Sequence, residues 1–239
     1  MKTNLQDFLD VLDSDDAKPL SVVISSKKKI TIKPLSFKQQ KALVTSGLDG
    51  ISGVMSFIKT LNDIILFNSE ETDLKIFDRV PIILALRKEL SSKKLTQDEV
   101  EVDVDDLITQ FKKIDTIKGD VVDGNGYTVQ LRIPTLKQEN KLLATCIEDM
   151  KKLDIDNMGK NISTILSYEI PKFIESITFG DSVIEFDEIS TSERVKIMDN
   201  LPANITNLIT DYILKVRDYD EQLLTFNGTT IEIDSTFFE

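Results

Sequence analysis

Alternation of apolar and polar residues predicts a β-hairpin near the start of the chain. Val22 and Ile24 precede a polar turn with three lysines at 27–29, and Ile30 and Ile32 follow it. A period of two residues is that of a strand with one buried face. We therefore expect two short antiparallel strands with lysines at the tip of their turn.

Two further hairpins are predicted, and both have strong turn sequences. Residues 121–122 and 127–132 flank the turn Asp-Gly-Asn-Gly, while residues 224–226 and 229–233 flank Asn-Gly near the end of the chain. Glycine and asparagine adopt the positive φ angles that tight hairpin turns need. Valines that alternate with acids over residues 100–104 indicate one more, half-exposed strand.

Capping boxes mark the starts of three helices. In such a box a Ser or Thr is followed three residues later by Gln or Glu, and the boxes begin at Ser36, Thr135 and Ser190. Apolar residues recur at steps of three and four in residues 51–65 and 205–216, as on the buried face of a helix. Together these patterns predict an α+β fold, in which β-hairpins are each followed by helices and a helical last third ends in a C-terminal hairpin.

A short internal repeat bears on the domain organisation. Residues 30–40 and 129–139 share the order strand, proline, Ser or Thr cap, apolar residue, Lys-Gln, helix. Either strand-to-helix junctions reuse the same parts, or the chain consists of two related lobes, and both interpretations stay open. We expect an acidic N-terminal arm at 1–19, a hairpin with helices at 20–95, and a hairpin, helices and the C-terminal hairpin at 97–239.

The N-terminal arm combines aspartates with a few apolar residues. Phe8, Leu9 and Leu12 have helical spacing, so a short amphipathic helix is one interpretation. The interpretation that we favour is a terminal segment that the rest of the chain holds only loosely.

Composition excludes several classes of catalytic and metal site. The 239 residues contain no histidine, no tryptophan and one cysteine. Ser-His-Asp and Cys-His nucleophiles are therefore absent, as are histidine-ligated zinc, haem and iron sites. A single cysteine forms neither an internal disulfide nor a cysteine-based zinc cluster, and it fits a reducing compartment. The net charge of −12 disfavours nucleic-acid binding, which needs a basic surface.

The chain has no segment typical of membrane insertion or export. Its longest apolar run covers only residues 81–86, whereas a membrane span needs about 20 apolar residues. Near the N-terminus, acids stand where a signal peptide has its apolar region. We therefore expect a protein without a membrane span that acts in the cytoplasm.

No motif for phosphate or calcium binding is complete. Residues 124–126 lie between two strands and lack the third glycine of a dinucleotide loop. Residues 154–159 begin like a calcium loop, but Met158 replaces an oxygen ligand and Ile165 the bidentate glutamate. Cys146, on an apolar helix face, has no histidine to activate it and is interpreted as a buried structural thiol. We expect no catalytic residue, no cofactor and no metal, and the pattern indicates an interaction protein.

Five short motifs occur in an order that is typical of one protein family. They are residues 30–43 (ITIKPLSFKQQKAL), 57–65 (FIKTLNDII), 77–88 (FDRVPIILALRK), 131–136 (LRIPTL) and 235–238 (STFF). In this order they resemble the baseplate hub assembly protein family of T-even-like contractile-tailed bacteriophages. Many members of that family carry a Cys-x-x-Cys metal site near the C-terminus. Here residues 223–233 have no cysteine, and an Asn-Gly turn replaces the metal site.

The resemblance implies a late viral protein that works in the host cytoplasm. It would help to build, or become part of, the central hub of the tail baseplate, and it would bind other hub and tail proteins by surface complementarity, without catalysis. One alternative is a cytoplasmic adaptor or regulatory module unrelated to phage. A more distant one is an acidic hydrolase that uses a pair of carboxylates.

The candidate partner-binding residues are Phe237 and Phe238, with Lys27, Lys28 and Lys29 as a secondary contact. If the terminal segment is extended, the two adjacent rings point to opposite faces, and only one is easily buried in the chain's own fold. The other ring would then be free to anchor a partner. The alternative is that both rings pack against the chain as a terminal latch.

Overall fold

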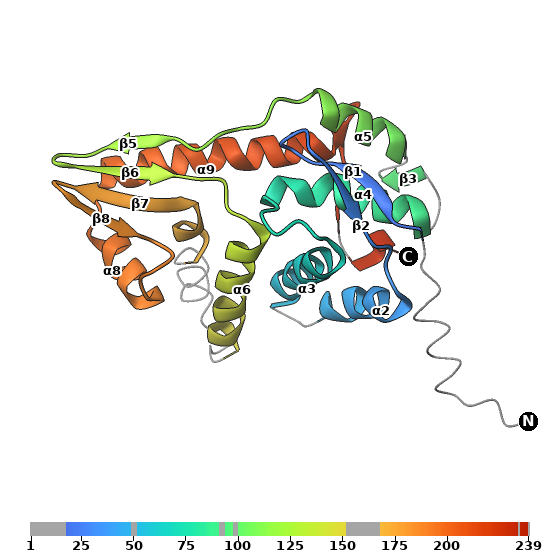
Figure 1. Cartoon of the computed structure of the whole chain (residues 1–239), viewed down its shortest axis with the longest axis horizontal. Helices are drawn as coiled ribbons and strands as arrows, with labels where there is room; N and C mark the ends of the chain where they lie inside the picture. The colour runs from blue at the N-terminus through green and yellow to red at the C-terminus, as the bar shows by residue number, and fades with distance from the viewer. Residues whose placement is uncertain are drawn as a thin grey trace, which may run out of the picture.

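The computed structural model describes residues 18–48, 52–90, 94–97, 100–151, 168–233 and 235–238. Residues 1–17 of the predicted arm at 1–19 and the calcium-like sequence at 154–159 lie outside these residues. The elements are arranged along one long axis (Figure 1), with a four-stranded sheet at one end and the first hairpin near the other.

The first half of the chain contains two antiparallel hairpins together with helices. Its hairpin of β1 and β2 is antiparallel, with Leu20 opposite Ile32, and β3 pairs with β4 in the same sense. The elements in order are β1 (Leu20–Val23), β2 (Lys29–Ile32), α2 (Phe37–Ser46), α3 (Gly53–Asn68), the 3-10 helix η2 (Ile76–Asp78), α4 (Arg79–Leu90), β3 (Lys94–Gln97), β4 (Val100–Asp103) and α5 (Val104–Lys113).

The second half is built around an antiparallel sheet with the strand order β5-β6-β7-β8. Its two middle strands are joined through α6, and two helices follow the sheet. The elements in order are β5 (Val121–Asp123), β6 (Tyr127–Leu131), α6 (Leu136–Met150), η3 (Pro171–Phe173), β7 (Ile174–Phe179), β8 (Ser182–Glu185), α8 (Thr191–Asn200), α9 (Ala203–Leu224), β9 (Thr225–Phe226), β10 (Thr229–Thr230) and η4 (Ser235–Phe238).

The predicted helix starts and hairpin turns are confirmed, and so is the α+β class. Ser36, Thr135 and Ser190 each form a complete capping box at the start of α2, α6 and α8. In the C-terminal hairpin, Asn227 and Gly228 have φ angles of 50° and 84°. These are the positive values that the turn sequence requires.

Two elements differ from the predictions. Residue Val104 does not continue the strand but begins α5, because the Asp103 side chain accepts the backbone N–H of Asp105 at 2.8 Å and caps a helix. The predicted helical last third also contains the hairpin of β7 and β8, which extends the predicted β5–β6 hairpin to four strands.

One continuous hydrophobic core runs through both halves of the chain. The long helix α9 contributes to it, and its Tyr219 ring packs edge-on against Phe77, with the ring centroids 4.5 Å apart. On the sheet, Val122, Val129 and Ile177 share a buried face. The division into units at 20–95 and 97–239 stays a prediction.

Candidate interaction surfaces

The three lysines of the first hairpin turn have different surroundings. Lys27 has a φ of 64°, and its Nζ donates to the carbonyl oxygen of Lys112 at 3.0 Å, at the end of α5. Lys28 forms an ion pair with Glu71, and Lys29 is exposed on β2. The hairpin tip is thus attached to the rest of the chain through two of its lysines.

The C-terminal phenylalanines are both buried. Their segment is the 3-10 helix η4 and not an extended strand, and it packs against α2 and α4. Phe237 and Phe238 are each 5% exposed, their ring centroids lie 5.2 Å apart, and the Arg87 guanidinium lies 5.8 Å from the Phe237 ring. The expectation of one exposed ring is wrong, and this geometry is that of the latch. Partner binding by these phenylalanines and by the tip lysines stays a prediction.

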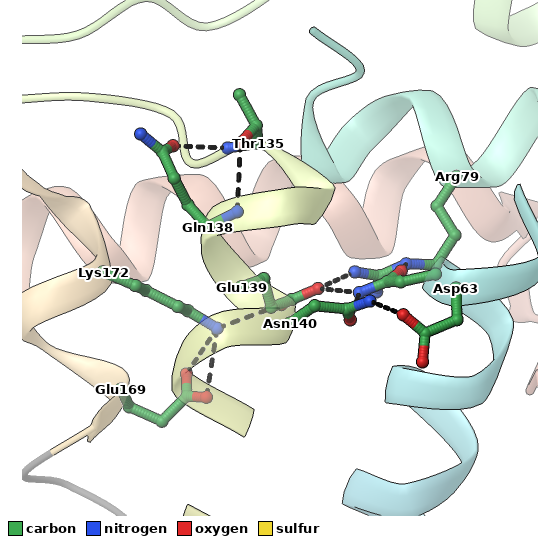
Figure 2. A network of polar contacts seen from close by, with 9 residues as sticks. Asp63, Arg79, Thr135, Gln138, Glu139, Asn140, Glu169 and Lys172 are labelled. Carbon is green, nitrogen blue, oxygen red and sulfur yellow. Dashed lines mark hydrogen bonds and ion pairs between the residues drawn. The ribbon is translucent and has the colours of Figure 1, made fainter. Parts of the chain in front are cut away.

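A buried polar network joins helices from the two halves (Figure 2). Its centre is Glu139 on α6, which accepts hydrogen bonds from Asn62 Nδ2 at 2.9 Å and from Lys172 Nζ at 3.3 Å. Glu139 also forms an ion pair with Arg79 at the start of α4. The Nε of Arg79 donates to Asn62 Oδ1 at 2.9 Å. One carboxylate therefore receives bonds from α3, α4 and the η3 segment.

The network extends from Glu139 in both directions (Figure 2). On one side, Asn62 Nδ2 donates to Asn140 Oδ1 at 2.9 Å, and Asn140 Nδ2 donates to Asp63 Oδ1 at 2.6 Å. On the other side, Lys172 Nζ donates to Glu169 Oε1 at 3.0 Å. Each of these side chains thus has a defined polar partner, as buried polar groups require.

Two neighbouring positive charges keep the Glu139 carboxylate ionised. Burial by itself would raise the pKa of Glu139, but the positive charges of Arg79 and Lys172, with hydrogen bonds from Asn62 and Lys172, lower it to about 2. The cavity beside this carboxylate has a volume of about 10 Å³, which is room for one water. The network therefore offers no space for a substrate, and it holds α3, α4 and α6 together.

Two phenylalanines stand exposed at one end of the α2–α3 pair. Phe37 begins α2 and Phe67 lies near the end of α3, and each is 80% exposed. The two helix ends are joined by a hydrogen bond from Gln39 Nε2 to Asn68 Oδ1 at 2.9 Å. Exposed aromatic side chains of this size on a folded chain mark a candidate binding surface.

Several exposed lysines lie on the same stretch of the chain as Phe37. The sequence from Lys18 to Leu48 contains seven lysines and no acidic residue, although the whole chain has a net charge of −12. All seven are exposed. Lys38 and Lys41 lie on α2 with Phe37, and Lys33 donates its backbone N–H to Asn68 O at the end of α3. We call the surface of Lys33, Lys38 and Lys41 with Phe37 and Phe67 the basic face.

The basic face was not among the predicted sites, although part of its signal is in the sequence. The lysine run without acids is visible there, but the net charge of the chain conceals it. A surface of cations and aromatic rings is complementary to a segment that carries carboxylates and apolar side chains.

A second apolar surface lies at the opposite end of the molecule, where Figure 1 places the sheet and α8. It is a groove of about 520 Å³. The Tyr127 hydroxyl is buried there without a hydrogen-bond partner among the described residues. We call this groove the end groove, and it is lined by Tyr127, Ile177, Phe179, Ile184, Lys196, Ile197, Asn200, Leu201 and Pro202.

The part of the chain that the structure describes has neither a cluster of metal-ligating side chains nor a helix suited to a membrane. No three Cys, Asp or Glu side chains gather there closely enough to hold a metal ion. None of its helices combines the length and the apolar character that a membrane crossing requires.

A family model with the description "T4 bacteriophage base plate protein" matches residues 18–220, which is most of the chain and extends from before β1 into α9. No curated protein and no solved structure matches significantly.

Proposed function

The chain belongs to the T4 bacteriophage base plate protein family, and on that premise we propose that it acts in the central hub of the baseplate, as an assembly factor or as a hub component. It binds other hub and tail proteins while the baseplate is built in the host cytoplasm, and it catalyses no reaction.

The basic face is the observation that carries this proposal. Phe37 and Phe67 are each 80% exposed, and aromatic anchors with cationic neighbours are typical of protein-binding surfaces. The end groove supplies a second apolar surface at the other end of the molecule. Two separate surfaces suit a protein that joins two partners.

The other two hypotheses have less support. Membership in a baseplate family speaks against an adaptor unrelated to phage. A hydrolase would need a carboxylate pair that a substrate can reach, but Glu139 is buried and ion-paired with Arg79 and Lys172.

Co-purification with the hub and tail proteins of the same phage tests the proposal. The tagged chain should retain at least one of them, identified by mass spectrometry. The double variant Phe37→Ser/Phe67→Ser should reduce this recovery about tenfold or more, which corresponds to ~1.4 kcal/mol of binding free energy. Its melting curve should not change, because both side chains are exposed.

The matched control is Leu208→Ser/Leu214→Ser on α9, where the side chains are 48% and 47% exposed. It removes exposed apolar surface away from the basic face and should leave recovery unchanged. If no hub or tail protein is retained, the proposed function is wrong. If the two double variants reduce recovery equally, the basic face is not the binding surface.

A further inference from the structure

We propose that the basic face binds the chain's own N-terminal segment, residues 1–17. This inference goes beyond the proposed function and does not depend on it, because binding within one chain can be measured without a partner. It assigns an occupant to the exposed phenylalanines, which a baseplate partner would then have to displace.

Charge complementarity is the first argument. Residues 1–17 contain five aspartates and one lysine, and the chain then changes to seven lysines without an acid from Lys18 to Leu48. Opposite charges attract most where the surfaces also exclude water. The basic face is therefore complementary to the segment that precedes it.

Apolar complementarity is the second argument. The N-terminal segment carries Phe8, Leu9, Val11 and Leu12 among its aspartates. The basic face offers two phenylalanine side chains that nothing in the described chain covers. Bringing these groups together removes apolar surface from water on both sides.

The point at which the described chain begins is the third argument. Leu20 pairs with Ile32 at the end of β2, and the next residue, Lys33, donates its backbone N–H to Asn68 O at 2.9 Å. The segment before Lys18 therefore starts beside the helix ends that carry the exposed rings. Seventeen residues can span up to ~55 Å, and a short tether gives an effective concentration on the order of millimolar.

Two other occupants are disfavoured by charge. A second copy of the chain carries the same net charge of −12, so long-range repulsion opposes its approach. Nucleic acid faces the same repulsion from the acids outside residues 18–48. The N-terminal segment is part of the same chain, so its aspartates reach the basic face without the approach of a second negatively charged molecule.

Tryptophan fluorescence of the full chain tests this proposal. The sequence has no tryptophan, so Phe8→Trp introduces a single reporter in the N-terminal segment. We expect its emission to be blue-shifted and protected from acrylamide at low salt. The triple variant Lys33→Glu/Lys38→Glu/Lys41→Glu, made in the Phe8→Trp chain, should shift the emission to that of a water-exposed indole.

The matched control is Lys137→Glu/Lys141→Glu/Lys215→Glu, which makes the same change in net charge at exposed lysines of α6 and α9. It should leave the emission blue-shifted. Phe37→Ser/Phe67→Ser, which leaves every charge in place, should shift the emission to the red as the first triple does. Melting curves verify that each variant is folded.

Three results would overturn the proposal. The first is a water-exposed emission from the Phe8→Trp chain itself. The second is an equal red shift from both lysine triples, which would make the effect one of net charge. The third is a blue shift that grows with protein concentration and accompanies a dimer in sedimentation, because the segment would then bind a second copy.

Discussion

Glu139 holds together elements from distant parts of the chain through one side chain. Asn62 on α3, Arg79 on α4 and Lys172 in η3 all donate to its carboxylate. Because the site is buried, removal of the carboxylate would take from Arg79 its ion-pair partner and leave Lys172 paired with Glu169 alone. The residue thus stabilises the contact between the two halves and needs no catalytic role to explain its burial.

We expect the free energy of unfolding to decrease as the pH is lowered from about 5 to about 2, in part through Glu139. Its pKa in the folded protein is about 2, below the ordinary value of ~4.3. A carboxyl group with a lowered pKa stabilises the fold above its unfolded pKa, and this contribution is lost as the pH falls through the folded pKa. Urea unfolding at a series of pH values measures the decrease.

The Glu139→Gln variant isolates this contribution. It should be less stable than the parent at pH 7 by about 3 kcal/mol or more, and the difference should shrink at pH 2. The comparison is needed because burial raises the pKa of Asp78 and of Asp220, and these two groups act in the opposite direction. Parallel pH curves for the parent and the variant would show that Glu139 has no such role. Glu188→Gln, at an exposed position, is the control.

At the scale of elements, η4 packs against α2 and α4 and thereby stabilises the first half of the chain. Phe237→Ala with Phe238→Ala should lower the free energy of unfolding by roughly 3 kcal/mol or more, because buried phenylalanines lose packing when truncated. Thermal melting measures this loss. Phe37→Ala with Phe67→Ala, at exposed positions, is the control and should leave the melting temperature within about a degree or two. An unchanged melting curve for the first pair would contradict the latch.

The elements that the sequence predicted correctly are specified by local hydrogen bonds. Capping boxes and the Asn-Gly turn form within four residues, so their sequences suffice to find them. The strand β7 was missed because a register shift between Gln130 and Leu131 places Ile174 and Ile177 on the same face. Buried positions three residues apart are also typical of a helix. The β-bulge that explains them here is recognised only from the pairing of β7 with β6.

The candidate surface was only partly predictable for a similar reason. Phe57 and Phe67 lie ten residues apart on α3, yet the first is buried and the second is exposed. The apolar spacing of the sequence does not separate them, because exposure depends on how α2 and α6 pack against α3. The same holds for Phe237 and Phe238, whose burial requires the surface of α2 and α4.

At the scale of the whole molecule, charge is distributed unevenly. An acidic chain presents a local basic face near one end, and the end groove lies at the other. This separation would let two partners bind at once without competing for the same surface. It also means that net charge alone is a poor guide to what each end of the molecule attracts.

We expect no appreciable binding to duplex DNA at physiological salt. The net charge of −12 repels phosphate, and screening weakens the attraction that seven exposed lysines can provide. Fluorescence anisotropy with a short labelled duplex measures this. Micromolar affinity at that salt would contradict the expectation, and its loss in Lys33→Glu/Lys38→Glu/Lys41→Glu would assign the binding to the basic face.

The continuous core also determines when folding can be completed during synthesis of the protein. Phe77 packs against Tyr219, and α2 packs against η4, so the first half lacks some of its partners until the last residues leave the ribosome. Until then apolar side chains of α2 and α4 remain open to other chains or to chaperones. A newly made copy therefore completes its fold only after its synthesis has ended.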